Sequence, residues 1–342
     1  MMLYWDGALR GAAVALLVLL AWHFARDWGR GTTARLGVAL ALGGVCYVVL
    51  IGLPGEAMDA WWRVPFHLGS LVTPGLFWLF AQSWFDDDFR LRPWHGAVLA
   101  LLMVGGASAN YCPWMPPAPF NVFSVLWHGL GMLLVALGLW AALRGRDADL
   151  VEGRRRMRLL LVSAIGVVIL WVVLSELSLD GWPAPVAWRV MNAASLLLLV
   201  AVLSAAMLAW RDPALLAAPP PAAEPAVVAD DSALLARLDA LMRRELLWRN
   251  EGVTMASVAA ALGVPEYRLR RAINQGLGAR NFNAWLNGYR LAEARAALSD
   301  PSQREVPILT IAMDAGFGSL APFNRAFREA EGCTPSEFRA RG

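Results

Sequence analysis

Seven apolar segments, each long enough to cross a lipid bilayer as a helix, fill the first 210 residues of the chain. Such a helix needs roughly 20 apolar residues to span about 30 Å of hydrocarbon. The fourth segment is the weakest, because Gly105, Gly106 and the polar residues 108–110 dilute it. The pattern predicts a seven-helix transmembrane bundle. Its spans are expected at 3–24, 36–53, 65–85, 94–110, 120–143, 158–177 and 186–210.

The composition changes abruptly along the 342-residue chain. Overall, 58% of the residues are hydrophobic and 17% are charged, whereas soluble domains carry about 25% charged residues. The apolar excess lies almost entirely before Trp210, and the residues after Asp230 have the composition of a soluble domain. Residues 211–231 are rich in proline and alanine, which is typical of a semi-rigid spacer. We therefore expect three parts: a membrane domain at 1–210, a linker at 211–231 and a soluble domain at 232–342.

Arginines are distributed unequally among the loops that connect the seven segments. The first, third and fifth loops, together with Arg158 at the start of the sixth segment, contain eleven arginines, whereas the second, fourth and sixth loops contain only Arg63. Loops that carry an excess of Lys and Arg remain in the cytoplasm. This rule places the N-terminus in the periplasm and the C-terminal domain in the cytoplasm, in agreement with an odd number of spans. We therefore predict a multi-pass protein of the bacterial inner membrane.

Four polar residues lie in the apolar segments: His67, Glu176 and Asn192 near the predicted outer ends, and His128 further inside its segment. Ionisable groups inside a membrane are costly and often functional. One interpretation is a sensing pocket for a small-molecule or protein effector. The other is an aromatic interface belt with hydrogen bonds between helices, and the sequence leaves both open. No catalytic motif and no metal-ligand spacing stands out, so we expect no enzyme activity, no metal and no cofactor.

The soluble part begins with an amphipathic helix over 232–249, which Asp230, Asp231 and Ser232 are placed to cap. A short helix at 255–262, a Gly-containing turn and a second helix at 265–275 follow, which is the helix-turn-helix pattern. In the second helix, Leu269 and Ile273 are expected to face inward. Three polar side chains of that helix are expected to face outward: Tyr267, Arg270 and Arg271.

The same pattern recurs after a long helix at 281–298. A helix at 308–315 and a turn around Gly316 lead to Ser319, which is placed to cap a helix at 320–331. Phe323 and Phe327 are expected to face inward. The polar residues of the last helix that are expected to face outward are Asn324, Arg325 and Arg328.

Four stretches of this region resemble the C-terminal signature of AraC-type transcription regulators. They are Arg290-Leu-Ala-Glu-Ala-Arg-Ala-Ala-Leu298, Ile308-Leu-Thr-Ile-Ala-Met-Asp-Ala-Gly-Phe317, Phe323-Asn-Arg-Ala-Phe327 and Gly332-Cys-Thr-Pro-Ser-Glu-Phe338. The resemblance covers about a hundred residues. It implies a seven-helix domain whose two recognition helices enter successive major-groove segments of DNA. The chain as a whole is thus expected to be all-α: a transmembrane bundle followed by a double helix-turn-helix domain.

The resemblance also implies which side chains read bases. By motif position these are Tyr267, Arg270 and Arg271 in the first unit, and Leu320, Ala321, Asn324 and Arg325 in the second. Leu320 and Ala321 depart from the family, where polar residues are frequent, which favours contact with thymine methyl groups there. Arg328 is expected to bind phosphate, and Arg270 or Arg271 could also bind phosphate instead of a base.

The sequence therefore predicts a membrane-bound, sequence-specific regulator of transcription whose spans sense a signal. Residues 232–342 contain 15 Arg against 11 Asp and Glu, a net charge of +4 (15 − 11), which permits binding of double-stranded DNA. The alternative is a seven-span transporter or membrane enzyme with a regulatory DNA-binding tail, and a third reading is a plain anchor released by proteolysis. The expected partners are DNA, the lipid bilayer and an unknown effector. Pairing with a second copy as a homodimer is left open.

Overall fold

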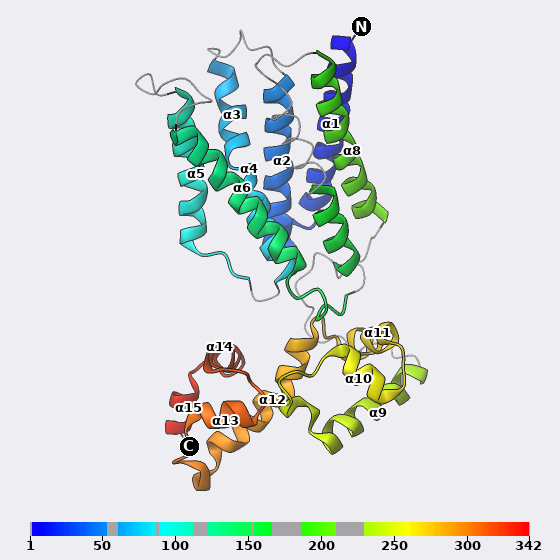
Figure 1. Cartoon of the computed structure of the whole chain (residues 1–342), viewed down its shortest axis with the longest axis vertical. Coiled ribbons are helices and arrows are strands. Elements are labelled where there is room, and N and C mark those ends of the chain that lie inside the picture. Colours follow the sequence, from blue (N-terminus) through cyan, green and yellow to red (C-terminus); the bar gives the residue numbers. More distant parts are fainter. Residues whose placement is uncertain are drawn as a thin grey trace. The chain divides into compact units, whose positions relative to one another are not determined.

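The computed structural model describes residues 2–52, 61–86, 89–111, 122–151, 154–165, 186–209 and 229–341. Within these ranges every regular element is a helix, apart from one isolated antiparallel bridge between Asp149 and Asn281. The all-α prediction is therefore confirmed for this part of the chain. The chain folds into two compact units (Figure 1). The first comprises residues 1–146 and 153–218, and the second comprises residues 147–152 and 219–342.

The first unit is a bundle of long apolar helices. Within the described residues, five segments are long and apolar enough to cross a membrane: Tyr4–Ala25, Thr32–Gly52, Trp61–Phe85, Leu126–Leu143 and Val186–Ala206. The helices themselves are α1 (Met2–Ala25), α2 (Thr32–Gly52), α3 (Val64–Leu71), α4 (Thr73–Phe85), α5 (Pro93–Tyr111), α6 (Val122–Leu143) and α8 (Val186–Ala209).

Two of the seven predicted spans are not among those five segments. The fourth forms α5, but its apolar part, Pro93–Ser108, is shorter than the others. The sixth begins in a helical stretch at 154–165, and the rest of it, 166–177, lies outside the described residues. The third predicted span is a single apolar segment divided at Val72 into α3 and α4. Pro74 explains the division, because proline lacks an amide donor and clashes with the carbonyl four residues earlier.

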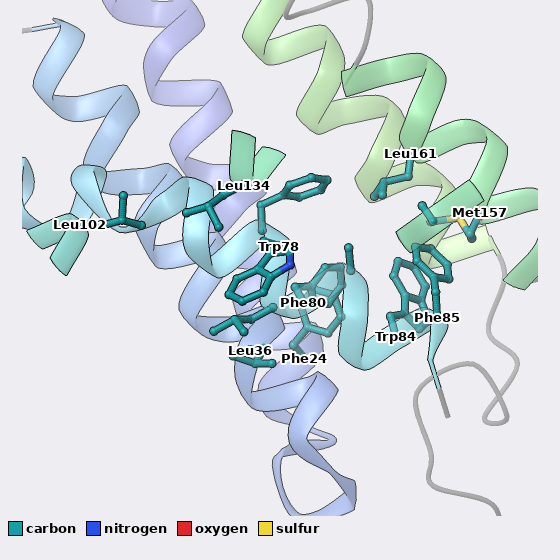
Figure 2. Packing of buried hydrophobic residues seen from close by; sticks show 14 residues of the cluster. Phe24, Leu36, Trp78, Phe80, Trp84, Phe85, Leu102, Leu134, Met157 and Leu161 are labelled. Carbon is teal, nitrogen blue, oxygen red and sulfur yellow. The ribbon is translucent and has the colours of Figure 1, made fainter. Parts of the chain in front are cut away.

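Helix α4 lies at the centre of the main core of this unit. Every residue from Gly75 to Ala81 is buried, and the surrounding side chains come from α1, α2, α5, α6 and the stretch 154–165. Figure 2 shows Phe24 and Phe80 in contact, with ring centroids 5.6 Å apart, and Trp84 beside Phe85 facing Met157. Large apolar side chains also cover the outer surface, for example Val104, Leu126 and Leu198 at 60–66% exposure. An apolar exterior of this kind fits a lipid environment.

Polar contacts show which helix ends lie together in this bundle. At one end, here called the Asp6 end, Arg189 of α8 donates to the Asp6 carboxylate of α1 (3.2 Å) and to the Gly52 carbonyl of α2 (3.3 Å). Arg63, which precedes α3, donates to the Leu50 carbonyl of α2. The starts of α1, α3 and α8 therefore lie beside the end of α2.

The opposite end, here called the Arg158 end, is organised by one buried arginine. Arg158 is 1% exposed, and it donates to the carbonyls of Phe85 (2.8 Å), Ala142 (3.1 Å) and Arg144 (2.8 Å). Cations are favourable beside the free carbonyls at helix C-termini. Thr33, at the start of α2, donates to the Ser83 carbonyl near the end of α4. The ends of α4 and α6, the start of α2 and the stretch containing Arg158 therefore lie together.

In its described residues the second unit contains seven α-helices, the number that the family resemblance implies. They are α9 (Ala229–Glu245), α10 (Met255–Leu262), α11 (Glu266–Leu277), α12 (Phe282–Ser299), α13 (Ile308–Asp314), α14 (Leu320–Glu331) and α15 (Pro335–Arg341). The helix predicted at 232–249 starts earlier and ends earlier. Asp230 and Asp231 accordingly lie inside the first turn of α9 and do not precede it.

Local signals fix most helix boundaries in this unit. Thr254 and Ser257 form a capping box at the start of α10, and Asn281 caps α12 through the amides of Asn283 and Ala284. Gly263 ends α10 with a φ of 67°, which glycine adopts without strain. Ser319 precedes α14 as predicted, but its side chain makes no capping hydrogen bond.

Candidate nucleic-acid interface

The first helix-turn-helix unit is formed by α10 and α11. Leu269 and Ile273 are fully buried in the core that α9 to α12 share, as predicted. Tyr267 is 67% exposed. The Arg271 side chain is 53% exposed, with one guanidinium nitrogen 3.6 Å from the Asp231 carboxylate. Both side chains are therefore accessible on α11.

The prediction that Arg270 faces outward is wrong in this structure. Arg270 is only 4% exposed. Its guanidinium donates to the backbone carbonyls of Asp147 (2.8 Å) and Asp149 (2.9 Å) and forms an ion pair with Glu266. The pattern of α11 alone could not reveal this burial, because the covering residues come from a distant part of the chain.

The second helix-turn-helix unit is formed by α13 and α14. Phe323 and Phe327 are fully buried and pack on each other, with ring centroids 5.5 Å apart. Leu320 is half-buried. The remaining predicted contact residues of α14 are all exposed: Ala321, Asn324, Arg325 and Arg328. This helix therefore presents one continuous polar face to solvent.

A buried arginine connects the two helix-turn-helix units. Arg290 of α12 donates to the carbonyls of Trp248 (2.8 Å) and Asn250 (3.0 Å), and its guanidinium lies 5.7 Å from the ring centre of Phe317. Burial lowers the pKa of this guanidinium, yet an arginine remains protonated. Gly316 approaches the same loop so closely that a Cβ there would lie 2.1 Å from the Trp248 carbonyl oxygen. The turn of the second unit is therefore fixed against the segment preceding the first.

Two comparisons of the chain with known proteins agree with this geometry. The family model described as "Helix-turn-helix domain" matches residues 258–341. The probable transcription factor PqrA of Proteus vulgaris is 32% identical over 96 residues, which cover 28% of this chain and 75% of that protein. The chain belongs to the AraC family of transcription regulators.

Other AraC-family relatives match this chain over a stretch of similar length. The arabinose operon regulatory proteins of Salmonella typhimurium and Escherichia coli are each 34% identical over 86 residues, a quarter of this chain. The match spans only 29% and 28% of those two proteins. No solved structure matches the chain significantly.

The four residues predicted to form a sensing pocket come from different parts of the bundle. His67 lies in α3, His128 in α6 and Asn192 in α8, whereas Glu176 lies outside the described residues. Within the described part of the chain, no group of His, Cys, Asp and Glu side chains is placed to hold a metal ion. The pocket therefore stays a prediction.

The bundle instead contains a buried ionic network that sequence reasoning missed. Asp6 and Arg10, 4% and 6% exposed, form an ion pair at 2.9 Å, and Asp6 also pairs with Arg189. The signal was present, because an acidic and a basic residue four positions apart in an apolar helix share one face. Arg189 could not be added from the sequence, since it lies in the last span.

Proposed function

We propose that this AraC-family protein is a membrane-embedded, sequence-specific transcription regulator whose N-terminal helices sense a signal and whose C-terminal domain reads DNA in the cytoplasm. One observation carries the proposal: helices of membrane-spanning length and a double helix-turn-helix domain occur in the same chain.

Contacts within the bundle support the count of seven spans. The ends of α4 and α6 both lie at the Arg158 end, and α6 is itself long enough to cross. The chain between them must therefore cross once more, and α5 is the helix that can do so. Arg158 and Arg189 lie at opposite ends of the bundle, which supports the sixth predicted span as part of the proposal.

The arginine distribution supports an orientation with the Arg158 end in the cytoplasm. The loops at that end, including the loop between α6 and the stretch 154–165, contain eleven arginines together with Arg158. Residues 147–152 of the same loop belong to the DNA-reading unit. This assignment supports the proposed orientation, in which the loop and the C-terminal domain are both cytoplasmic.

For DNA recognition we propose base contacts by Tyr267 and Arg271 from α11, and by Asn324 and Arg325 from α14. These side chains are accessible and lie on the two helices whose place in the motif corresponds to recognition helices. Leu320 and Ala321 favour thymine methyl groups. Arg328, one turn further along α14, is placed to bind phosphate.

The signal is proposed to act at the Asp6 end, which faces the periplasm in this orientation. The buried Asp6–Arg10–Arg189 network connects α1, α2 and α8 there. Buried ionic groups within a membrane bundle are costly and often functional. A ligand can act only by favouring one arrangement of the helices over another.

Chromatin immunoprecipitation of the intact, tagged protein tests the proposed function. We expect enrichment of a small set of promoters and its loss in the Arg271→Ala/Arg325→Ala variant at equal membrane abundance. Deleting residues 1–210 should leave promoter binding but remove its response to growth conditions. An intact protein that enriches no promoter would contradict the proposal.

A further inference from the structure

A short segment of the loop after α6 packs into the DNA-reading unit. Residues 147–151 lie between two helices of the first unit, α6 and the stretch 154–165, yet they belong to the second. The Leu150 amide donates to the Arg280 carbonyl (2.9 Å), and the Phe282 amide donates to the Ala148 carbonyl (2.7 Å). These two bonds form the antiparallel bridge between Asp149 and Asn281. The segment is thus held against the domain by a pair of backbone hydrogen bonds.

Side chains reinforce this pairing. Leu150 is 3% exposed and belongs to the same apolar core as Leu238 of α9 and Ile273 of α11. Asp149 is fully buried, and its carboxylate accepts a hydrogen bond from the Val151 amide (3.1 Å), which holds the segment in a turn. The contact therefore combines backbone bonds, apolar burial and a fixed local conformation.

The segment also binds Arg270, a residue at a predicted DNA-reading position. One guanidinium nitrogen of Arg270, Nη1, donates to both Asp147 and Asp149, and Nη2 is paired with Glu266. An arginine reads guanine by donating two hydrogen bonds to the base edge, which requires these same nitrogens. Its neighbours Tyr267 and Arg271 remain accessible on the same helix. The segment therefore withholds one base reader and leaves the others exposed.

We propose that residues 147–151 are an autoinhibitory clamp on the first helix-turn-helix unit, and that full DNA recognition requires their release from Arg270. This inference rests on the proposed function. The segment is five residues long, and the chain on either side of it leads to helices of the first unit. A change in the position of those helix ends would therefore act on Arg270 through the covalent chain, without a diffusible messenger.

A disulfide introduced at the bridge would hold the segment in place until it is reduced, and so it tests the clamp. Asp149 and Asn281 face each other as a non-hydrogen-bonded pair, because the two bonds join their neighbours. The Cα atoms of such pairs lie about 4.5 Å apart, within the range that a disulfide accepts. The Asp149→Cys/Asn281→Cys variant of the full chain, in detergent, should therefore cross-link on oxidation. The single Asp149→Cys variant is the matched control.

Affinity is measured for a duplex that the wild-type full chain selects from a random library. Oxidation of the double variant should weaken binding at least tenfold, and reduction should restore it, with no change in the single variant. Adding Arg270→Ala should weaken binding by the reduced protein but not by the cross-linked one. Equal affinity of the oxidised and reduced forms overturns the clamp alone. If neither form nor the wild type binds DNA, the proposed function itself fails, and the clamp with it.

Hydrogen exchange on the wild-type chain decides the question even if the cysteine variant does not fold. Saturating duplex should increase exchange at the Leu150 and Phe282 amides, because the bridge opens when Arg270 engages a base. Unchanged or slower exchange at both amides would show that the segment is a permanent part of the domain and would overturn the proposal.

Discussion

The Nη1 atom of Arg270 lies 2.9 Å from the carbonyl oxygen of Asp149, a residue 121 positions earlier in the chain. This bond joins α11 to a segment that lies in sequence between α6 and the stretch 154–165. The family resemblance assigns the position of Arg270 to base reading, and the clamp proposed above rests on this bond.

Base readers and phosphate contacts should differ in how their loss affects binding. Arg271→Ala and Arg325→Ala should each cost about 1–3 kcal/mol in affinity and relax the preference at one base position. Arg328→Ala should weaken all sequences alike and reduce the slope of log affinity against log salt by about one. Competition binding at several salt concentrations measures both effects. Uniform weakening by all three variants would show that the base readers are assigned wrongly.

The order of spans predicts the outcome of reporter fusions. Alkaline phosphatase, which is active only outside the cytoplasm, should be active when fused after Tyr111 and inactive after Arg146 or Gly342. A fluorescent protein fused after Gly342 should fluoresce. Activity after Tyr111 tests α5 as a crossing, and activity after Pro185 tests the sixth span. An active phosphatase after Gly342 would place the DNA-reading domain on the wrong side of the membrane.

The buried Asp6–Arg10 pair should be sensitive to loss of one partner. Removing one member of a buried ion pair typically costs about 3–5 kcal/mol, whereas replacing both by apolar residues is often neutral. Asp6→Leu should therefore lower the melting temperature of the full chain in detergent, and Asp6→Leu/Arg10→Leu should recover much of the loss. The exposed Arg26→Leu is the control and should change little. If the double variant is as unstable as the single one, the pair is not the source of the effect.

Arg290 should hold the two helix-turn-helix units in a fixed relationship. Arg290→Met removes the hydrogen bonds to Trp248 and Asn250, and a bond from a charged donor contributes about 1.5–3 kcal/mol. Amide exchange in this region should accelerate at least roughly tenfold, since the loss of even one such bond costs about 1.5 kcal/mol and about 1.4 kcal/mol is a factor of ten. Arg295→Met, which removes a surface ion pair with Glu331, should have little effect. Equal acceleration in both variants would contradict the role of Arg290.

Features set by local chemistry could be predicted from the sequence. The helices Met255–Leu262 and Leu320–Glu331 begin and end where they were expected. A capping residue before the first and glycines after both explain this, because each acts within one turn of the boundary. The start of α9 was missed, since Ala229 precedes the acidic residues expected to cap the helix.

Features set by distant contacts could not be predicted. The periodicity of α11 predicts that Arg270 faces outward, whereas its guanidinium is held by the carbonyls of Asp147 and Asp149. Asp6 and Arg10 are neighbours on one helix, but their third partner, Arg189, is 183 residues from Asp6. In both cases the missing information is a tertiary contact that no local pattern encodes.

The central claim is that one chain reads DNA in a sequence-specific way while its helices remain in a bilayer. Selection of duplexes from a random library by the full-length protein in lipid nanodiscs tests it most directly. We predict enrichment of a motif with two segments about one helical turn, 10–10.5 base pairs, apart, and loss of that motif with Arg271→Ala/Arg325→Ala. No enriched motif, or one that the double variant selects equally well, would contradict the account.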